Sequence, residues 1–164
     1  MTEYYSAAET EKHKKQEKRL IIIAGALFLA FNAGAVRACI GVNSGNASVR
    51  LAAAVLCGTA ACVLPVLLYV YRFQPLRALR RHEEGILEEA GKNGTTAGEG
   101  VLCDSGHWVA LPGSIRYRLL TLESDDGKSE IRIPYEKRER LPQNAVRARV
   151  SLVRGYLYTL EEIK

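Results

Sequence analysis

The residue types that most often carry chemistry are few in this chain and lie apart in the sequence. The three histidines, His13, His82 and His107, fall in three separate segments, and the four cysteines form no Cys-x-x-Cys pair. Nucleophile-elbow, zinc-protease and nucleotide-binding motifs are absent from the sequence. We therefore predict that the protein is not an enzyme and that it holds no metal ion and no cofactor.

A second group of candidates is a set of arginines on predicted strands near the C-terminus. Its members are Arg116, Arg118, Arg132, Arg147 and Arg149. If the strands pair in sequence order, all five project from one outer face. Such a face suits an anionic lipid headgroup, a nucleotide or an acidic partner. The alternative is a solvated face with cross-strand ion pairs to acids such as Glu130.

Nucleic acid is not an expected partner. The predicted domain has a single Trp, and its Tyr residues are needed for the core, so no aromatic platform remains for stacking bases. The positive net charge of +5 gathers beside an apolar block, and residues 12–19 carry five Lys or Arg against one Glu. Bases beside an apolar block are typical of the cytoplasmic flanks of membrane spans.

The elements that must position these residues begin with two apolar blocks, 20–36 and 51–71. Each is about long enough to cross a hydrocarbon core of about 30 Å at 1.5 Å per helical residue. Bases precede the first block and follow the second. We therefore predict a two-span hairpin in the plasma or inner membrane, with both termini cytoplasmic and the lipid bilayer as a partner.

Small residues recur at four-residue spacing in both spans. Together with one amide, the candidate helix contacts are Ala26, Ala30, Asn32, Gly34, Ala54 and Gly58. Small side chains let helices approach closely in lipid, and an amide in hydrocarbon needs a hydrogen-bond partner. Two uses stay open, which are packing of the two spans against each other and self-association. Pro65 predicts a kink in the second span.

From residue 100 the apolar residues alternate with polar ones, which is typical of strands. The predicted strands are 100–104, 107–111, 115–123, 128–134, 145–153 and 156–161. Turns are predicted at Pro112-Gly113 and at Asp126-Gly127, the latter as a hairpin. The charged stretch 134–144 is predicted to be a loop. We expect an antiparallel meander that curls into a small barrel of SH3-like or OB-like type.

The predicted core of this β-domain comprises Val101, Trp108, Val109, Ile115, Tyr117, Leu119, Ile131, Ile133, Val146, Val150, Leu152, Tyr156 and Tyr158. The predicted organisation is a polar basic tail at 1–19, a transmembrane hairpin at 20–71, a juxtamembrane amphipathic helix at 72–90, a flexible linker at 91–99 and a β-domain at 100–164. The fold class is thus a membrane α-helical hairpin plus a small all-β cytoplasmic domain.

Over residues 20–161 this layout resembles that of the bacterial NfeD-like membrane proteins and similar families. The resemblance lies in the arrangement of hairpin, linker and small barrel, and it carries over no functional residue. It implies that the barrel is an interaction module beside a membrane partner. We therefore expect an interaction or regulatory module that docks a partner protein. The alternatives are a homo-oligomeric channel or membrane effector, and a sensor of an anionic ligand.

Overall fold

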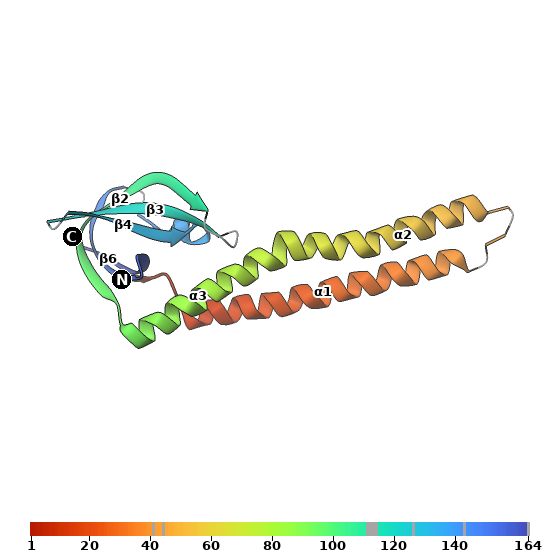
Figure 1. Cartoon of the computed structure of the whole chain (residues 1–164), viewed down its shortest axis with the longest axis horizontal. Helices are drawn as coiled ribbons and strands as arrows, with labels where there is room; N and C mark the ends of the chain where they lie inside the picture. Colours follow the sequence, from red (N-terminus) through yellow and green to blue (C-terminus); the bar gives the residue numbers. More distant parts are fainter. Residues whose placement is uncertain (41, 44, 111–114, 126, 143, 164) are drawn as a thin grey trace. The chain divides into compact units, whose positions relative to one another are not determined.

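The computed structural model describes residues 1–40, 42–43, 45–110, 115–125, 127–142 and 144–163, and Figure 1 draws the chain. The chain forms two compact units. One consists of residues 13–77, and the other combines residues 1–12 with residues 78–164. The predicted turn at Pro112-Gly113 and Asp126 of the predicted hairpin lie outside the described residues.

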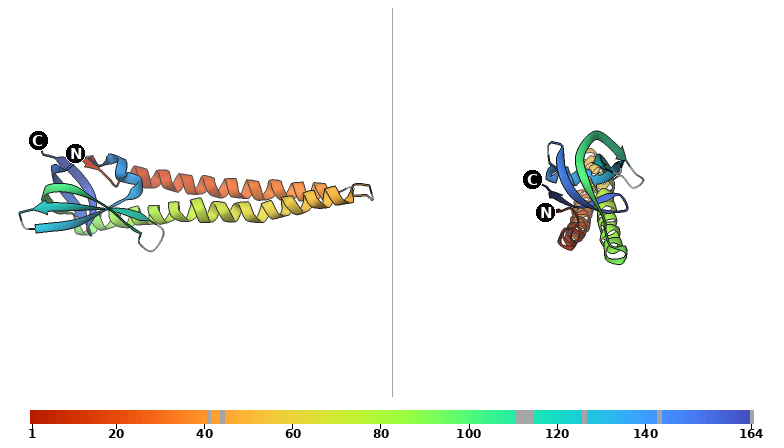
Figure 2. Two further views of the ribbon diagram at one scale, coloured as in Figure 1. Left: turned by 90° about the horizontal axis from the view of Figure 1, so that it is seen from above. Right: turned by 90° about the vertical axis from the view of Figure 1, so that its left-hand side faces the viewer.

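Two long helices form the unit of residues 13–77. Helix α1 runs over Ala7–Cys39 and α2 over Ala47–Leu68, and Figures 1 and 2 show them as an antiparallel pair. In the connection between them, the backbone N–H of Asn43 donates to Oδ1 of Asn46 at 2.9 Å. The backbone N–H of Asn46 donates to Oδ1 of Asn43 at 3.1 Å. These two bonds replace backbone partners that the chain loses where it leaves the helices.

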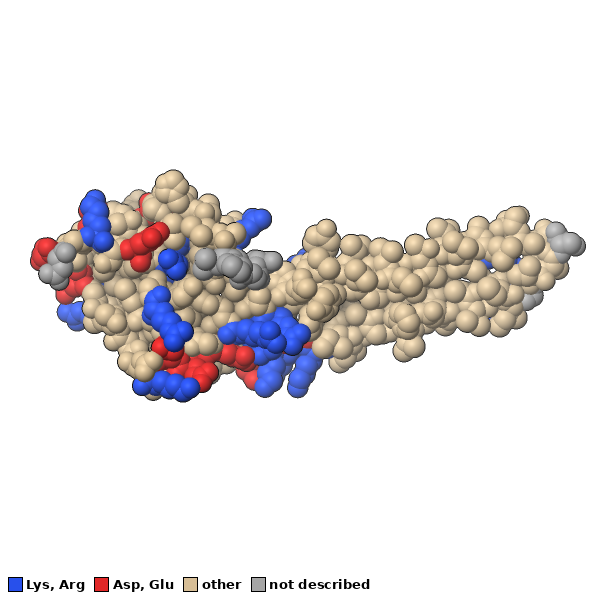
Figure 3. Space-filling view, in the orientation of Figure 1, with Lys and Arg blue, Asp and Glu red and all other residues tan. Residues whose placement is uncertain are grey.

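Apolar side chains of both helices point mostly away from their contact. Ile22 is 70% exposed, Leu29 69% and Leu56 70%. Figure 3 shows that charged side chains are nearly absent from the visible face of the helix pair over most of its length. The helical runs Ala7–Cys39 and Ala47–Asn93 are long and apolar enough to cross a membrane, by length and composition.

A π-helical turn follows the proline of α2. Pro65 has no N–H to donate and its ring crowds the preceding turn. Four residues later, the backbone N–H of Tyr69 donates to the carbonyl oxygens of both Pro65 and Val66. The π-helix η1 begins there and runs over Tyr69–Phe73. Single π-helical turns inside longer helices widen the helix locally and often mark functional positions. Helix α3, Gln74–Asn93, continues directly from η1.

The other unit contains a six-stranded sheet with the order β1-β6-β4-β3-β2-β5. The strands are β1 Thr2–Glu3, β2 Thr96–Ala110, β3 Arg116–Ser124, β4 Gly127–Pro134, β5 Val146–Val153 and β6 Tyr156–Glu162. Strand pairs are antiparallel except β4 with β6, which pair in parallel at Arg132 and Tyr156. Because β5 also pairs with β6, five strands close into a ring, whose curvature is visible in Figure 2. The predicted layout of long helices and an antiparallel β-domain is confirmed.

The predicted linker at 91–99 is wrong. Helix α3 continues to Asn93 and β2 begins at Thr96. Thr96 pairs with Leu152 of β5, so the backbone of this small, polar stretch finds its hydrogen bonds in the sheet. Its composition is typical of flexible segments, but pairing with a neighbouring strand overrides local propensity.

The N-terminal residues belong to the β-domain. Thr2 and Glu3 pair with Leu160 and Thr159 of β6, and the N–H of Tyr4 donates to the Tyr158 carbonyl at 2.9 Å. Residues 1–19 are therefore not a tail, since a short strand leads into α1. Strand β1 lies along the part of β6 beyond its pairing with β4, where the ring of strands would otherwise leave an edge open.

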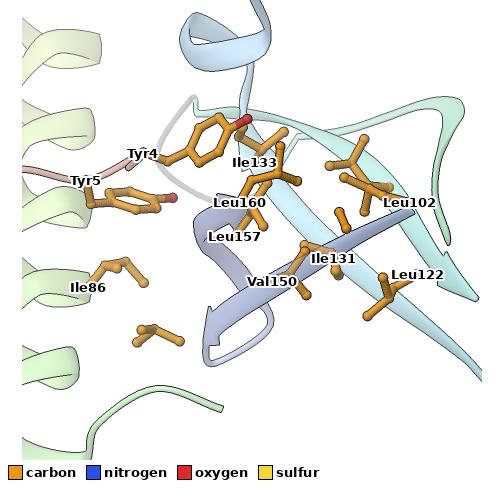
Figure 4. Close-up of a cluster of buried hydrophobic side chains, with 13 residues drawn as sticks. Tyr4, Tyr5, Ile86, Leu102, Leu122, Ile131, Ile133, Val150, Leu157 and Leu160 are labelled. Atoms are coloured by element: carbon orange, nitrogen blue, oxygen red, sulfur yellow. The ribbon is translucent and has the colours of Figure 1, made fainter. Parts of the chain in front are cut away.

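The core of the β-domain gathers side chains from every layer of this unit, as Figure 4 shows. Its buried members are Tyr4, Tyr5, Ile86, Leu102, Leu120, Leu122, Ile131, Ile133, Ala148, Val150, Val153, Leu157 and Leu160. Of the predicted core, Val101 and Trp108 are instead 38% and 40% exposed. Along β2 the inward face is that of Leu102, one residue out of phase with the prediction, because period two alone does not say which face is inside.

Helix α3 covers the sheet with one face. Its buried residues Leu79, Glu83 and Ile86 recur at intervals of four and three, so they form a single stripe. A 3-10 helix, η2, covers Tyr135–Arg140 between β4 and β5. The predicted loop over 134–144 thus contains a short helix with one fully enclosed charge, Lys137 at 6% exposure.

Candidate functional site

A bulge in β2 creates the most distinctive part of the β-domain surface. The pairing of β2 with β3 shifts between Asp104 and Trp108, where two strands at 100–104 and 107–111 were predicted. Gly106 has φ +71°, a conformation that glycine adopts without strain, and its N–H donates to Asp104 Oδ1 at 2.9 Å. Ser105 Oγ donates to the Leu119 carbonyl at 2.6 Å. The bulge therefore continues one strand and re-aims Asp104 and Trp108.

Two aromatic rings and two arginines meet beside this bulge. The Trp108 and Tyr135 rings pack edge to face with centroids 4.5 Å apart. The guanidinium of Arg118 lies 4.6 Å from the Trp108 ring centre, and that of Arg138 lies 3.7 Å from the Tyr135 ring centre. Asp104 accepts two N–H groups of Arg118. We call Asp104, Trp108, Arg118, Tyr135 and Arg138 the Trp108 surface.

A cavity of about 260 Å³ opens within the Trp108 surface. It is lined by Asp104, Arg118, Arg138, Leu141 and Pro142. The hydrogen bond from Arg118 holds the pKa of Asp104 below its ordinary value, so this carboxylate is charged at neutral pH and neutralises Arg118. Within the described part of the chain, Arg138 has no acidic partner, so the cavity carries a net positive charge. Such a cavity can accept a carboxylate.

Lys137 fixes the helix that carries Tyr135 and Arg138. Its Nζ lies 2.8 Å from Glu83 Oε1 and 3.1 Å from Glu9 Oε2, and it donates to the Tyr4 carbonyl. It also lies 4.2 Å from the centre of the Tyr5 ring. A buried ammonium is tolerated when nearby carboxylates match its charge and its N–H groups find acceptors, here the Tyr4 carbonyl and Glu9. Lys137 thereby ties η2 to α3, to the start of α1 and to the segment after β1.

Arg140 adds a second attachment between η2 and the N-terminal segment. Its guanidinium donates to Glu9 Oε1, and its carbonyl accepts a hydrogen bond of 2.9 Å from the Tyr4 hydroxyl. Burial acts to raise the pKa of Glu9, but hydrogen bonds from Arg140 and Lys137 outweigh it and leave that pKa below its ordinary value. Glu9 is therefore charged at neutral pH and bridges both bases.

His82 packs in a cage of tyrosines next to Glu83. Its ring centre lies 4.6 Å from that of Tyr156, 5.3 Å from Tyr117 and 6.0 Å from Tyr5. The Tyr5 hydroxyl lies 3.4 Å from His82 Nε2. Burial is the main cause that lowers the pKa of His82 to about 4, against the opposing effect of Glu83. The ring is neutral at pH 7, so it packs as an aromatic side chain of α3 and does not act as a cation.

Of the five predicted arginines, Arg118 belongs to the Trp108 surface. Register along β3 puts Arg116 and Arg118 on the same face as Leu120, because alternate residues of a strand share a face. Arg132 pairs with Leu119 and lies on the opposite face. The prediction that all five share one face is therefore wrong.

Arg147 and Arg149 also lie on that opposite face, since they alternate with the buried Ala148 and Val150. Both form ion pairs with Glu99 of β2. The guanidinium nitrogen lies 3.6 Å from a carboxylate oxygen of Glu99 for Arg147 and 3.5 Å for Arg149. This is the cross-strand pairing with acids that the sequence left open as an alternative, with Glu99 in place of Glu130. The arginines do not form a continuous cationic face.

Only some of the small residues predicted as helix contacts lie between α1 and α2. An added Cβ at Gly34 would lie 3.3 Å from Cys57 Sγ, so Gly34 faces α2. Ala26 and Ala30 are exposed, because a four-residue step advances about 40° beyond one full helical turn and the stripe drifts off the contact. Ala54 and Gly58 are half-buried, and an added Cβ at Gly58 would meet nothing within 4 Å.

Asn32 satisfies its amide within its own helix. Its Nδ2 donates to the Phe28 carbonyl at 2.7 Å, one turn earlier in α1. Among the described residues of this chain, Asn32 makes this bond and not the predicted bond across to α2. This donor is therefore satisfied one turn earlier in α1 and does not need the other helix.

No group of three or more His, Cys, Asp or Glu side chains among the described residues converges as metal ligands. Comparison of the chain with protein-family models, with curated proteins and with solved structures found no match. Sequence reasoning missed Tyr135 and Arg138 because they lie in a charged stretch that is typical of a solvated loop. The local signal that points to them is the proline at each end of this stretch, since Pro134 and Pro142 restrict its conformations.

Proposed function

We propose that the protein is a membrane-anchored interaction module whose β-domain binds an acidic segment of a partner protein at the cytoplasmic face. The observation that carries the anchor is the exposure of the apolar helices. In the most apolar 18-residue stretch of α1, no part is buried. In the corresponding stretch of the helical run Ala47–Asn93, 6% is buried. The core helix of a soluble protein would be mostly buried, and each exposed square ångström of apolar surface costs about 25 cal/mol in water.

The pairing of β1 with β6 supports a two-span topology. Helices α1 and α2 lie between these two strands in the sequence, while Thr2 pairs with Leu160. A chain that leaves one side of a bilayer and pairs with itself on that same side must cross an even number of times. Two spans meet this condition, and bases before the first and after the second favour the cytoplasmic side.

The composition of the Trp108 surface supports a docking role. Trp, Tyr and Arg are the residue types most enriched at the energetic centres of protein interfaces. Trp108 keeps 40% of its surface exposed although its ring is held by Tyr135 and Arg118. A ring fixed before binding loses little conformational entropy on contact. The guanidinium of Arg138 at the cavity has no acidic partner among the described residues, which favours a partner with Asp or Glu beside an apolar residue.

The order of the ring supports the OB-like alternative among the predicted barrels. The closed order is β2-β3-β4-β6-β5, with β4 and β6 parallel. OB-type barrels are five-stranded and bind their ligands at one face, which fits a binding module. This likeness of topology says nothing of the ligand, which we infer from the Trp108 surface.

Purification of the full-length protein from its native membrane in mild detergent tests the proposal. We expect a stoichiometric second protein, identified by mass spectrometry, with an acidic segment that binds the purified full-length chain. Trp108→Ala and Arg138→Ala should each weaken that binding at least about tenfold, the loss typical of an interface centre. Arg147→Ala removes an exposed arginine outside the Trp108 surface and serves as the control. Unchanged binding by both surface variants would contradict the docking role.

Self-association is a second candidate, and Gly58 is the observation that favours it. An added Cβ there would meet nothing within 4 Å, so α2 offers a small-residue position to a second copy. A homo-oligomer of defined mass in the same purification would support this candidate. Gly58→Leu should then dissociate it. The third candidate, an anionic-ligand sensor on an arginine face, is less favoured because Arg118, Arg147 and Arg149 each pair with an acid.

A further inference from the structure

The helix pair contains an apolar groove between α1 and the region around Pro65. It has a volume of about 300 Å³ and is lined by Leu20, Ile21, Ala24, Pro65, Leu68, Tyr69 and Phe73. The lining side chains are apolar or aromatic. The volume lies at the lower end of the range of small-molecule sites. In a bilayer such a groove would be filled by hydrocarbon and not by water.

Backbone irregularity explains why the groove exists. The proline of α2 and the π-helical turn η1 interrupt the regular i to i−4 bonding on one side of the groove. On the other side Ala24 presents a methyl group where larger residues would fill the gap. The rings of Tyr69 and Phe73 stack with centroids 5.4 Å apart and form the end wall. A groove with these causes is built into the helix pair.

Basic side chains lie near Phe73, which lines the groove. The guanidinium carbon of Arg77 is 5.9 Å from the centre of the Phe73 ring. The segment 69–77 contains Arg72 and Arg77 and no acid, and Lys18 and Arg19 directly precede Leu20. Basic side chains at a membrane interface attract anionic headgroups.

An apolar slot that ends in cations matches one chemical class, a phospholipid with a net negative headgroup. Its acyl chain fits the slot and its phosphate meets guanidinium groups, which bind phosphate with two parallel hydrogen bonds. We propose that the groove binds an anionic phospholipid, with the acyl chain along Ala24 and Pro65 and the headgroup at Arg77. This inference rests on the proposed membrane insertion, and the lipid would contribute to holding the helix pair at the cytoplasmic interface.

The test uses the full-length protein reconstituted in nanodiscs of equal parts phosphatidylglycerol and phosphatidylcholine. Native mass spectrometry after release reads which lipid stays bound. We expect preferential retention of phosphatidylglycerol. Arg77→Gln should lower the ratio of retained phosphatidylglycerol to phosphatidylcholine about fivefold, the equivalent of one interfacial base. Ala24→Leu should reduce retention of both lipids because it fills the slot.

Matched variants outside the groove serve as controls. Arg37→Gln removes a base at the far end of α1, and Ala30→Leu enlarges an exposed alanine of the same helix. Both should retain lipid as the unmodified protein does. Helix content by circular dichroism verifies that each variant folds.

The outcomes separate this inference from the proposed function. Extraction of the unmodified protein from membranes by alkaline carbonate would overturn the anchor and the lipid site together. A protein that resists carbonate but retains both lipids equally would overturn the lipid site and leave the anchor standing. Loss of lipid in the Ala30→Leu control to the same extent as in Ala24→Leu would also overturn it.

Discussion

Lys137 Nζ lies 2.8 Å from Glu83 Oε1, and the two side chains are only 6% and 1% exposed. Removing Glu83 takes away the more deeply buried of the two carboxylates beside Lys137 and leaves this ammonium with Glu9, which Arg140 shares. We predict that Glu83→Gln lowers the free energy of unfolding by about 3 kcal/mol. Urea unfolding of the full-length protein in detergent measures this, because the single tryptophan, Trp108, lies in the β-domain and reports its unfolding by fluorescence.

A neighbouring glutamate provides the control for this prediction. Glu84 pairs with Arg80 at 2.6 Å on the exposed side of the same helix, so Glu84→Gln should cost less than about 1 kcal/mol. The double change Glu83→Leu with Lys137→Met replaces both charges by apolar groups and should recover most of the lost stability. Equal effects of Glu83→Gln and Glu84→Gln would contradict the importance of the buried pair.

The depressed pKa of His82 predicts a pH dependence of stability. Burial lowers this pKa to about 4, whereas the unfolded chain binds its proton near the ordinary value of 6.5. Between these values the unfolded state holds the extra proton, so the free energy of unfolding falls as pH falls from about 6.5 to about 4. Urea midpoints at about pH 7 and about pH 5 measure the slope.

His82→Phe keeps an aromatic ring in the tyrosine cage and removes the titrating group. It should flatten the slope in that window, while His107→Phe, on the exposed part of β2, should retain it. Glu9 also contributes acid sensitivity, because its pKa is held below the ordinary value by Arg140 and Lys137. Its contribution is lost below about pH 4.5 and is therefore separable from that of His82.

Tyr4 is fully buried and joins the N-terminal segment to the barrel. Tyr4→Ala should cost about 3–5 kcal/mol, the range for removing a large core side chain. Tyr4→Phe loses the hydrogen bond from the hydroxyl to the Arg140 carbonyl and should cost about 1 kcal/mol. Fluorescence-detected urea unfolding distinguishes the two. A Tyr4→Ala variant as stable as Tyr4→Phe would show that burial of the Tyr4 ring does not stabilise the barrel.

Two glycines give opposite expectations for the same substitution. An added Cβ at Gly100 of β2 would lie 2.8 Å from the carbonyl carbon of Glu123, so Gly100→Ala should push β2 from β3 and cost about 2 kcal/mol or more. Gly85, on the exposed side of α3, has open space, and Gly85→Ala should stabilise by up to about 1 kcal/mol. Thermal unfolding of both variants gives the two signs directly.

Local patterns suffice for the strands that alternate clearly. Val146 and Val150 with intervening arginines predict β5, and Arg154-Gly155 predicts its turn to β6, where Arg154 has φ +51° and Gly155 φ +80°. For β3 the sequence does not show which face points inward, because the adjacent residues Leu119 and Leu120 are both apolar. Alternation then fits either face, and the face that packs inside is fixed by β4 and β2.

The candidate site is harder to predict because its supports are distant in sequence. Lys137 and the Tyr4 carbonyl that it binds are 133 residues apart. A lysine in a run of charged residues is typical of solvent-exposed loops, and nothing local indicates that Glu83 and Glu9 will enclose it. The two-residue strand β1 is likewise too short for any periodicity, since its pairing depends entirely on β6.

The pairing of β1 with β6 has a consequence for biosynthesis. A ribosome makes β1 before the two apolar helices and β6 after them, so the two halves of this pair emerge at different times. The barrel therefore stays incomplete while the two apolar helices are made. Tyr4 and Tyr5 can take their places in the core only after β6, with which this segment pairs, has been made. The β-domain can thus close only after both apolar helices have been synthesised, although its first strand is made before them.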